Sequence, residues 1–95
     1  MEEEIVRVRM PRGSEMIGTV LEMLGASRFR VDCSDGKERI CRVPGKYKRR
    51  VWVRVGNIVL LRPWSVQGDE RGDIIWRYTP SQANWLVKRG LLKQS

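Results

Sequence analysis

The dipeptide Asp35-Gly36 stands between two stretches in which apolar and polar residues alternate, and it constrains the fold more than any other feature of the sequence. The alternation over residues 27–33 has the period of a half-buried strand. Asp-Gly after such a stretch favours a hairpin with a type I′ turn, because this turn requires a positive φ at both central positions. We therefore predict two antiparallel strands, residues 27–33 and 37–43, joined by a tight turn at Asp35-Gly36.

Other segments have the patterns of strands and of one helix. Strands are predicted at residues 16–24, where a short helix is the alternative, and at 58–63 and 74–78. Residues 51–55 alternate like a strand that leads into residues 58–63. The residues Thr79-Pro80-Ser81-Gln82 match a helix start with a capping box, and Gly90 is a typical helix stop. An all-β, partly open barrel of the oligonucleotide-binding (OB) type, followed by a helix, fits this order; a barrel of the SH3 type fits the strand count almost as well.

The expected organisation is one domain with two tails. It comprises a flexible N-terminal tail at residues 1–14, a barrel at 15–79, a helix at 80–90 that packs on the barrel, and a short tail at 91–95. The chain lacks the roughly 20 consecutive apolar residues that span a bilayer, and it lacks the apolar core of a secretory signal. We therefore expect a soluble cytoplasmic protein.

The positive charge is concentrated in the middle third of the chain, whose whole length carries a formal net charge of +8. Residues 1–26 carry three basic and five acidic side chains, residues 27–62 carry eleven and three, and residues 63–95 carry five and three. A concentrated basic field attracts polyanions. No basic amphipathic helix or lipidation signal is present, so nucleic acid is favoured over a membrane surface.

The residue types that most enzymes and metal sites require are missing or unfavourably placed. No histidine occurs, which excludes histidine-dependent nucleophilic catalysis and histidine metal ligands, and no glycine-rich phosphate-binding motif occurs. Asp69, Glu70 and Asp73 are close together, but they lie in a charged, glycine-containing loop that is typical of a solvated turn. We expect a protein without catalytic activity, metal or cofactor.

The two cysteines are too few for a disulfide framework and lack the paired CxxC spacing of a zinc site. In the predicted hairpin Cys33 lies opposite Glu38 and Cys41 lies opposite Arg30, so the two sulfurs do not meet. We expect free, partly buried thiols. If the register of the hairpin were shifted, a disulfide between the two cysteines would remain possible in an oxidising or hot environment.

The segment VPGKYKRRVWVRVG, residues 43–56, contains five basic side chains, one tyrosine, one tryptophan and no acid. Lysine and arginine neutralise phosphates, while aromatic faces and guanidinium planes stack on unpaired bases. Basic and aromatic residues of the flanking segments extend this surface. The candidate RNA-binding residues are Arg39, Arg42, Lys46, Tyr47, Lys48, Arg49, Arg50, Trp52, Arg54, Arg62 and Trp64.

Less specific interpretations of these residues stay open. The lysines can form an ordinary solvated face, and Trp52 fits the core as well as it fits an RNA contact, whereas Trp76 and Trp85 are predicted core residues. A small basic protein that coats double-stranded DNA shares the size and the charge. The net negative charge of residues 1–26 argues against such general coating.

Four motifs occur in a recognisable order: MLG at residues 23–25, CSDGKERIC at 33–41, GKYKRRVWV at 45–53 and GNIVLL at 56–61. With these motifs the chain resembles, over about residues 16–90, the archaeal and eukaryotic translation initiation factor one-A family, the counterpart of bacterial initiation factor one. The resemblance implies an OB barrel of the S1/initiation-factor-one type with a C-terminal helix.

The same resemblance implies a non-enzymatic factor that binds the small ribosomal subunit at the decoding A site through ribosomal RNA. It implies that the factor excludes elongator tRNA there and promotes initiation-complex assembly and start-codon selection, with initiator tRNA and other initiation factors as partners. Like-charge repulsion and the lack of apolar heptads favour a monomer. The family's RNA-facing loop corresponds to Gly45, Lys46, Lys48, Arg49 and Arg50, its tryptophan to Trp52, and its basic or polar hairpin positions to Arg39 and Arg42.

Both tails depart from the eukaryotic pattern. Eukaryotic members have a basic N-terminal tail, whereas acidic residues stand here at positions 2–4. They also have an acidic C-terminal tail that binds the subunit-joining GTPase, whereas this sequence ends in LLKQS. The short form resembles the archaeal members, and the functions of the eukaryotic tails are not transferred to this chain.

Overall fold

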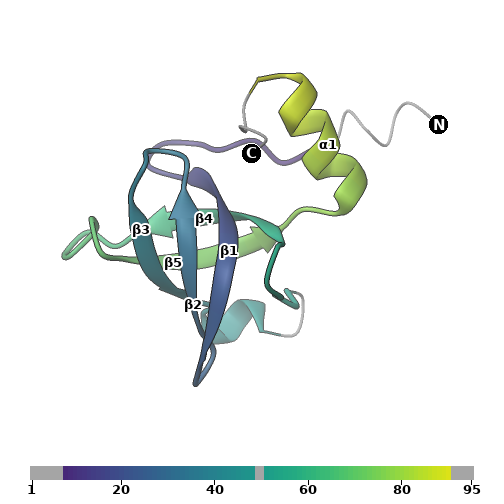
Figure 1. The fold of residues 1–95 in the computed structure, drawn as a ribbon. Helices are drawn as coiled ribbons and strands as arrows, with labels where there is room; N and C mark the ends of the chain where they lie inside the picture. Colours follow the sequence, from purple (N-terminus) through teal and green to yellow (C-terminus); the bar gives the residue numbers. More distant parts are fainter. Residues whose placement is uncertain (1–7, 49–50, 91–95) are drawn as a thin grey trace.

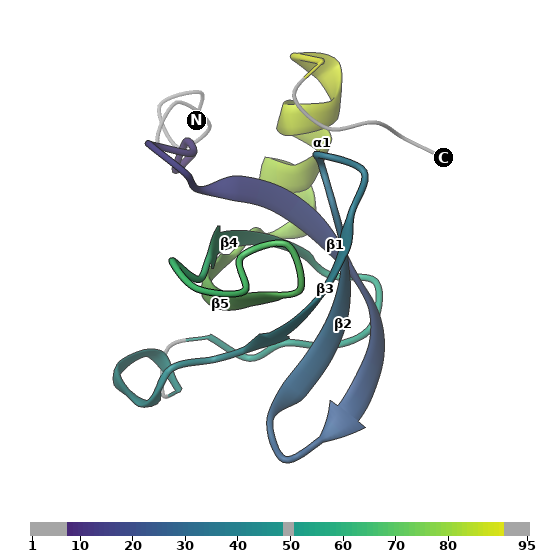
Figure 2. The same ribbon diagram turned by 90° about the vertical axis from the view of Figure 1, so that its left-hand side faces the viewer.

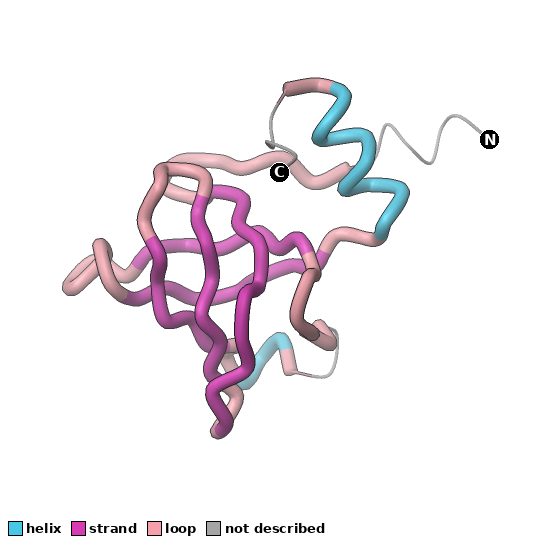
Figure 3. Tube along the Cα trace, in the orientation of Figure 1, coloured by secondary structure: helices cyan, strands magenta, loops and turns pink. Residues whose placement is uncertain are grey.

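A computed structural model describes residues 8–48 and 51–90 of the chain (Figure 1). Its elements are β1 (Met16–Gly25), β2 (Arg28–Cys33), β3 (Glu38–Arg42), the short 3-10 helix η2 (Gly45–Tyr47), β4 (Ile58–Pro63), β5 (Arg71–Arg77) and α1 (Pro80–Lys88). The strands, coloured magenta in Figure 3, form a closed barrel in the order β1-β2-β3-β5-β4. The predicted OB barrel with a C-terminal helix is confirmed, although the barrel is closed where a partly open one was expected.

Most strand pairs are antiparallel, but β3 and β5 pair in parallel. This parallel pair is short, with Ile40 opposite Arg71 and Arg42 opposite Asp73 at its two ends. It joins the hairpin of β2 and β3 to the pair of β4 and β5, while β1 pairs with β4 on the other side. The parallel pair therefore closes the barrel.

Two hydrophobic clusters hold these elements together, because alternate strand residues point to opposite faces of a sheet. The barrel interior consists of Val20, Phe29, Val31, Cys33, Cys41, Val43, Val51, Val53, Val59, Leu61 and Ile74. The second cluster, between the outer face of the barrel and α1, consists of Val8, Ile17, Leu60, Ile75, Tyr78 and Leu86. Helix α1 thus lies at one end of the molecule and the turn between β1 and β2 at the other (Figures 1 and 2).

The capping box at the start of α1 is confirmed in full. The Gln82 backbone N–H donates to Thr79 Oγ1 over 3.2 Å, and the Thr79 backbone N–H donates to Gln82 Oε1 over 3.0 Å. Pro80 occupies the first helical position, where its missing N–H is harmless. This local pattern was predictable because all its interactions lie within four residues.

The register of the β2–β3 hairpin differs from the prediction by one residue. Asp32 pairs with Glu38 and Phe29 with Cys41, and the Gly36 N–H donates to the Cys33 carbonyl. Only Gly36 of the expected turn has a positive φ, at 88°. The connection is therefore a longer one than the predicted type I′ turn, and the new register places the buried Phe29 and Cys41 on the same face.

The cysteines remain apart in this register. Cys33 and Cys41 are both buried and both free. Burial raises the pKa of the Cys41 thiol to about 12, which disfavours its reactive thiolate.

The turn with two consecutive positive φ values lies instead between β1 and β2. Gly25 pairs with Arg28, and the two residues between them, Ala26 and Ser27, have φ values of 52° and 59°. Side chains with a Cβ seldom adopt this left-handed conformation, so the sequence carries no conventional signal for the turn.

Residues 51–55 do not form a strand, although their side chains alternate partly as predicted. Val51 and Val53 are buried and Trp52 and Arg54 are exposed, but Val55 is exposed as well. The Arg54 N–H donates to the Asn57 side chain instead of to a neighbouring strand. The segment is therefore extended but outside the barrel's hydrogen-bonded ladder.

The described part of the N-terminal segment is packed against the barrel. Val8 is buried in the second cluster, the Tyr78 hydroxyl donates to the Arg9 carbonyl, and the Arg12 N–H donates to Glu15. Residues 1–7 and 91–95, where further parts of the two tails were predicted, lie outside the described residues. None of the helices in the described ranges is both long and apolar enough to cross a membrane.

Gly18 in β1 lies where the barrel has no room for a side chain. A Cβ built on it would lie 2.5 Å from Val31 Cγ1 and 2.9 Å from Leu61 Cδ2. We predict that Gly18→Ala lowers the free energy of unfolding by about 1–3 kcal/mol, because the core must shift to admit the methyl group. Urea denaturation measures this change, and Gly45→Ala is the control, since a Cβ there meets nothing within 4 Å. Equal stability of the two variants would contradict the prediction.

Candidate nucleic-acid interface

The basic loop after β3 is anchored by its tyrosine and exposes its lysines. Lys46 and Lys48 are exposed, while Tyr47 is partly buried and packs against both hydrophobic clusters. Lys46 Nζ lies 5.2 Å from the centre of the Tyr47 ring. Tyr47 thus holds the loop on the barrel, and the lysines point to solvent. Arg49 and Arg50, also candidate RNA-binding residues, lie outside the described residues.

Trp52 is 72% exposed, which excludes the interpretation of this residue as part of the core. Its neighbours Val51 and Val53 are buried, so the backbone is attached to the barrel while the indole projects from it. A hollow of about 210 Å³ beside the indole is lined by Ser27, Phe29, Val43, Lys48, Val51, Trp52 and Val53. An exposed indole next to an apolar hollow and a lysine offers a stacking face and a cation together.

A second hollow, of about 420 Å³, adjoins the first, because both are lined by Ser27, Val43 and Lys48. Two arginines, Arg28 and Arg42, also line it. Arg28 was not among the candidate residues, although its position on the outer face of the predicted strand, two residues from Arg30, was a usable signal.

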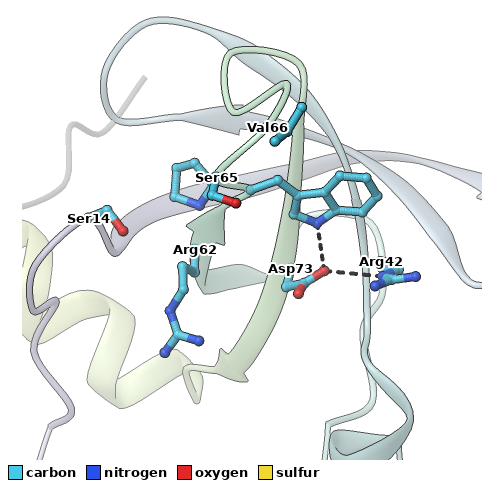
Figure 4. A pocket seen from close by; sticks show the side chains of 8 residues that line it. Ser14, Arg42, Arg62, Ser65, Val66 and Asp73 are labelled. Carbon is cyan, nitrogen blue, oxygen red and sulfur yellow. Dashed lines mark hydrogen bonds and ion pairs between the residues drawn. The ribbon is translucent and has the colours of Figure 1, made fainter.

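Arg42 connects this region with a third hollow of about 620 Å³ on the side of Trp64 (Figure 4). Arg42 Nε donates to Asp73 Oδ1 over 3.2 Å, and Trp64 Nε1 donates to the same oxygen over 2.9 Å. The Arg42 guanidinium carbon also lies 5.0 Å from the centre of the Trp64 ring. Asp73 therefore orients a cation and an aromatic ring that were both predicted to contact RNA.

The remaining candidates at the edges of this surface differ in whether an acidic side chain pairs with them. Arg54 is exposed and follows Trp52. Arg62 lines the third hollow, but its guanidinium forms an ion pair with Glu15 over 3.1 Å. The three hollows thus connect five of the described candidates in a series from Trp52 through Lys48 and Arg42 to Arg62 and Trp64.

Arg39 is the exception, and its predicted contact with RNA is corrected by the structure. Its side chain is 3% exposed, and its guanidinium donates to both carboxylate oxygens of Asp35, over 2.9 and 2.8 Å. Its Nε donates to the Gly68 carbonyl. With these donors engaged inside the protein, Arg39 holds the β2–β3 turn to the β4–β5 loop. The alternation that places Arg39 on the same face as Cys41 was the missed signal.

Asp69 and Asp73, two acidic residues of the β4–β5 region, each have basic partners. Asp69 is engaged with Lys37 over 2.8 Å, and Asp73 holds Arg42 and Trp64. Within the described ranges no three histidine, cysteine or acidic residues are grouped as metal ligands would be.

Trp76 and Trp85, predicted as core residues, are partly buried against the second cluster. An arginine lies over each ring: Arg9 at 5.9 Å from the Trp76 ring centre and Arg89 at 4.9 Å from that of Trp85. Both rings therefore lie on the helix side of the barrel, and neither lines the three hollows.

Comparison with known proteins gives consistent matches. The family model described as translation initiation factor 1A / IF-1 matches residues 3–95. Translation initiation factor 1A of Methanococcus aeolicus is 54% identical over 95 residues, covering 98% of this chain and 90% of its own length. That of Pyrococcus abyssi is 50% identical over 92 residues, with coverages of 97% and 81%.

A solved structure with lower sequence identity shows the same relationship. The solution structure of translation initiation factor one from the Wolbachia endosymbiont of Brugia malayi superposes with a TM-score of 0.54 at 30% sequence identity. The match covers 73% of this chain and 82% of that one. The agreement supports an OB barrel as the common fold.

The ion pair between the buried Arg39 and the partly exposed Asp35 generates a prediction about stability. We predict that Arg39→Met lowers the free energy of unfolding by about 1–3 kcal/mol, because it leaves the Asp35 carboxylate and the Gly68 carbonyl without their partner. Lys37→Met is the control: it breaks an exposed pair with Asp69, which solvent screens, and should leave stability almost unchanged. Urea denaturation at pH 7 measures both, and equal losses would contradict the prediction.

The same ion pair predicts a pH dependence. Hydrogen bonds from Arg39 hold the pKa of Asp35 below its ordinary value of 3.8. The ionised carboxylate therefore stabilises the folded state fully above about pH 4, and this contribution disappears as the pH falls through the lowered pKa. Unfolding midpoints measured between pH 7 and 2.5 should fall more steeply in the acid range for the parent protein than for Asp35→Asn. Parallel curves would show that Asp35 does not contribute.

Proposed function

The chain belongs to the translation initiation factor 1A / IF-1 family, and from this premise we propose that it binds the small ribosomal subunit at the decoding A site through ribosomal RNA. The role in translation initiation follows from family membership. The A site and the RNA contact are the proposed extensions of that role.

The observation that carries the proposal is the exposed Trp52 beside Lys48, at one end of the three connected hollows. Cations along such a surface neutralise phosphates, and the rings offer stacking faces for unpaired bases. The proposed contacts are those of the sequence prediction without Arg39: Arg42, Lys46, Lys48, Arg49, Arg50, Trp52, Arg54, Arg62 and Trp64. Tyr47 acts in the same surface by anchoring its loop.

We propose that the protein acts by occupying its site and catalyses no reaction. A rigid barrel on the A site excludes elongator tRNA and favours assembly with initiator tRNA and other initiation factors at the start codon. We propose that the protein acts in this way as a monomer in the cytoplasm.

The basic loop provides the first test. We predict that replacing Lys48, Arg49 and Arg50 together by alanine weakens binding to small ribosomal subunits without unfolding the protein. Each lost phosphate contact reduces the slope of log affinity against log salt by about 0.7 to 0.9, so the three together reduce it by about 2 to 3. Sedimentation with purified subunits across a salt series measures the slope.

A triple alanine variant at Arg77, Lys88 and Arg89 is the matched control, because it removes the same charge at the helix end of the barrel. Large subunits and duplex DNA serve as competing ligands. Equal slopes for the two triple variants would contradict the proposed interface. Equal binding of the parent protein to both subunits and to duplex DNA would indicate a general polyanion surface of the DNA-coating kind.

A further inference from the structure

The hollow of about 420 Å³ at the turn between β1 and β2 has cations on its walls and no acid. It is lined by Ala26, Ser27, Arg28, Arg42, Val43, Pro44, Gly45 and Lys48. Its three cations come from three different segments, namely β2, β3 and the loop after η2. The fold, and no single sequence motif, brings them together.

Two of these cations oppose each other directly. Arg28 pairs with Arg42 across the antiparallel strands β2 and β3. Like charges at directly opposite positions destabilise a sheet. Arg42 is partly neutralised through its Nε by Asp73, but none of the hydrogen bonds or ion pairs within the described ranges involves the Arg28 side chain. The repulsion is therefore only partly relieved within the described protein.

Arg30, the next arginine on the same strand, has its charge neutralised by neighbouring carboxylates. Arg30 lies two residues from Arg28 and forms ion pairs with Glu22 at 3.0 Å and with Glu38 at 3.8 Å. An acid at the equivalent places around Arg28 would relieve its repulsion with Arg42 in the same way. The described residues supply none there, so the described part of the chain leaves a place for an anion beside Arg28.

The rim of the hollow is formed by an unfavourable turn. Ala26 and Ser27 both adopt positive φ values, a strained backbone conformation for residues other than glycine. This turn holds the Ser27 hydroxyl and the start of β2 at the hollow. Strain and repulsion at one place weaken the free protein, and an anion bound between the cations would offset the repulsion.

We propose that Arg28, Arg42 and Lys48 form a binding site for one phosphate group, which in the ribosomal complex is a backbone phosphate of ribosomal RNA. The inference rests on the proposed function for the source of the phosphate and adds Arg28 as a contact. Arg42 is already oriented by Asp73 and Trp64, so it contributes a guanidinium of set direction. Arg28 and Lys48 supply the opposing charges, and the Ser27 hydroxyl is a further donor.

Salt dependence tests the RNA contact. Arg28→Ala should reduce the log-log salt slope of small-subunit binding by about 0.7 to 0.9, so that a fourfold rise in salt weakens binding about threefold less than in the parent protein. Arg30→Ala is the matched control, since it removes the same charge from the same strand and face but from an arginine already paired with two acids. Its slope should stay that of the parent.

Thermal unfolding tests the site in the free protein. In chloride, Arg28→Ala should unfold at the same temperature as the parent or higher, because the like-charge pair with Arg42 is gone. Inorganic phosphate, compared with chloride at equal ionic strength, should raise the unfolding temperature of the parent and of Arg30→Ala by more than that of Arg28→Ala, which keeps only the general stabilisation that phosphate gives to folded proteins. A merely structural role for Arg28 would instead lower the unfolding temperature and leave the phosphate effect in place.

The two measurements separate the possible failures. Equal salt slopes for Arg28→Ala and Arg30→Ala would overturn the RNA contact, and a phosphate effect that nevertheless depends on Arg28 would assign the site to a free phosphate group. A phosphate effect independent of Arg28 would overturn the site itself. If the parent protein fails to bind small subunits, the proposed function fails, while the phosphate measurement still decides the site.

Discussion

The ion pair between the buried Arg39 and the partly exposed Asp35, with the further bond from Arg39 to the Gly68 carbonyl, is the interaction on which much of the structure depends. It lies beside the parallel pairing of β3 with β5, which closes the barrel through only a few residues. Such a short pair is weakly held by its own ladder, and a guanidinium that joins the β2–β3 turn to the β4–β5 loop fixes both of its sides. The closure in turn sets Asp73 opposite Arg42 and thereby orients Trp64.

Structure and function are linked here through the different environments of arginines on two neighbouring strands. Arg39 is buried and stabilises the fold, while Arg30 is exposed and neutralised by two carboxylates. Arg42 is held by Asp73 between two hollows, and Arg28 opposes it. An arginine side chain thus stabilises the fold where a carboxylate faces it, and it remains available to bind a ligand where none does. Net charge alone does not distinguish these cases, because burial and pairing decide how much of each charge reaches a ligand.

Several features of the fold were predictable because their causes are local. Alternating residues placed β2 and β3, although the similar alternation over residues 51–55 does not form a strand, and Thr79 with Gln82 placed the start of α1. The β2–β3 register was missed by one residue, because the Asp-Gly signal was assigned its commonest turn. Matching the buried faces of Phe29 and Cys41 would have corrected it. The Ala26-Ser27 turn had no conventional signal at its two central positions, since residues with a Cβ seldom adopt positive φ values.

The sequence by itself determined the order of strands and helix, the concentration of charge around residues 43–56 and the family to which the chain belongs. These follow from short-range patterns and from motifs that survive in the linear chain. Only the tertiary structure decided which charges are available to a ligand. Arg39 meets Gly68, and Arg42 meets Asp73, across about 30 residues of intervening sequence. No local rule relates residues so far apart, because their contact exists only when parallel pairing of β3 and β5 closes the barrel.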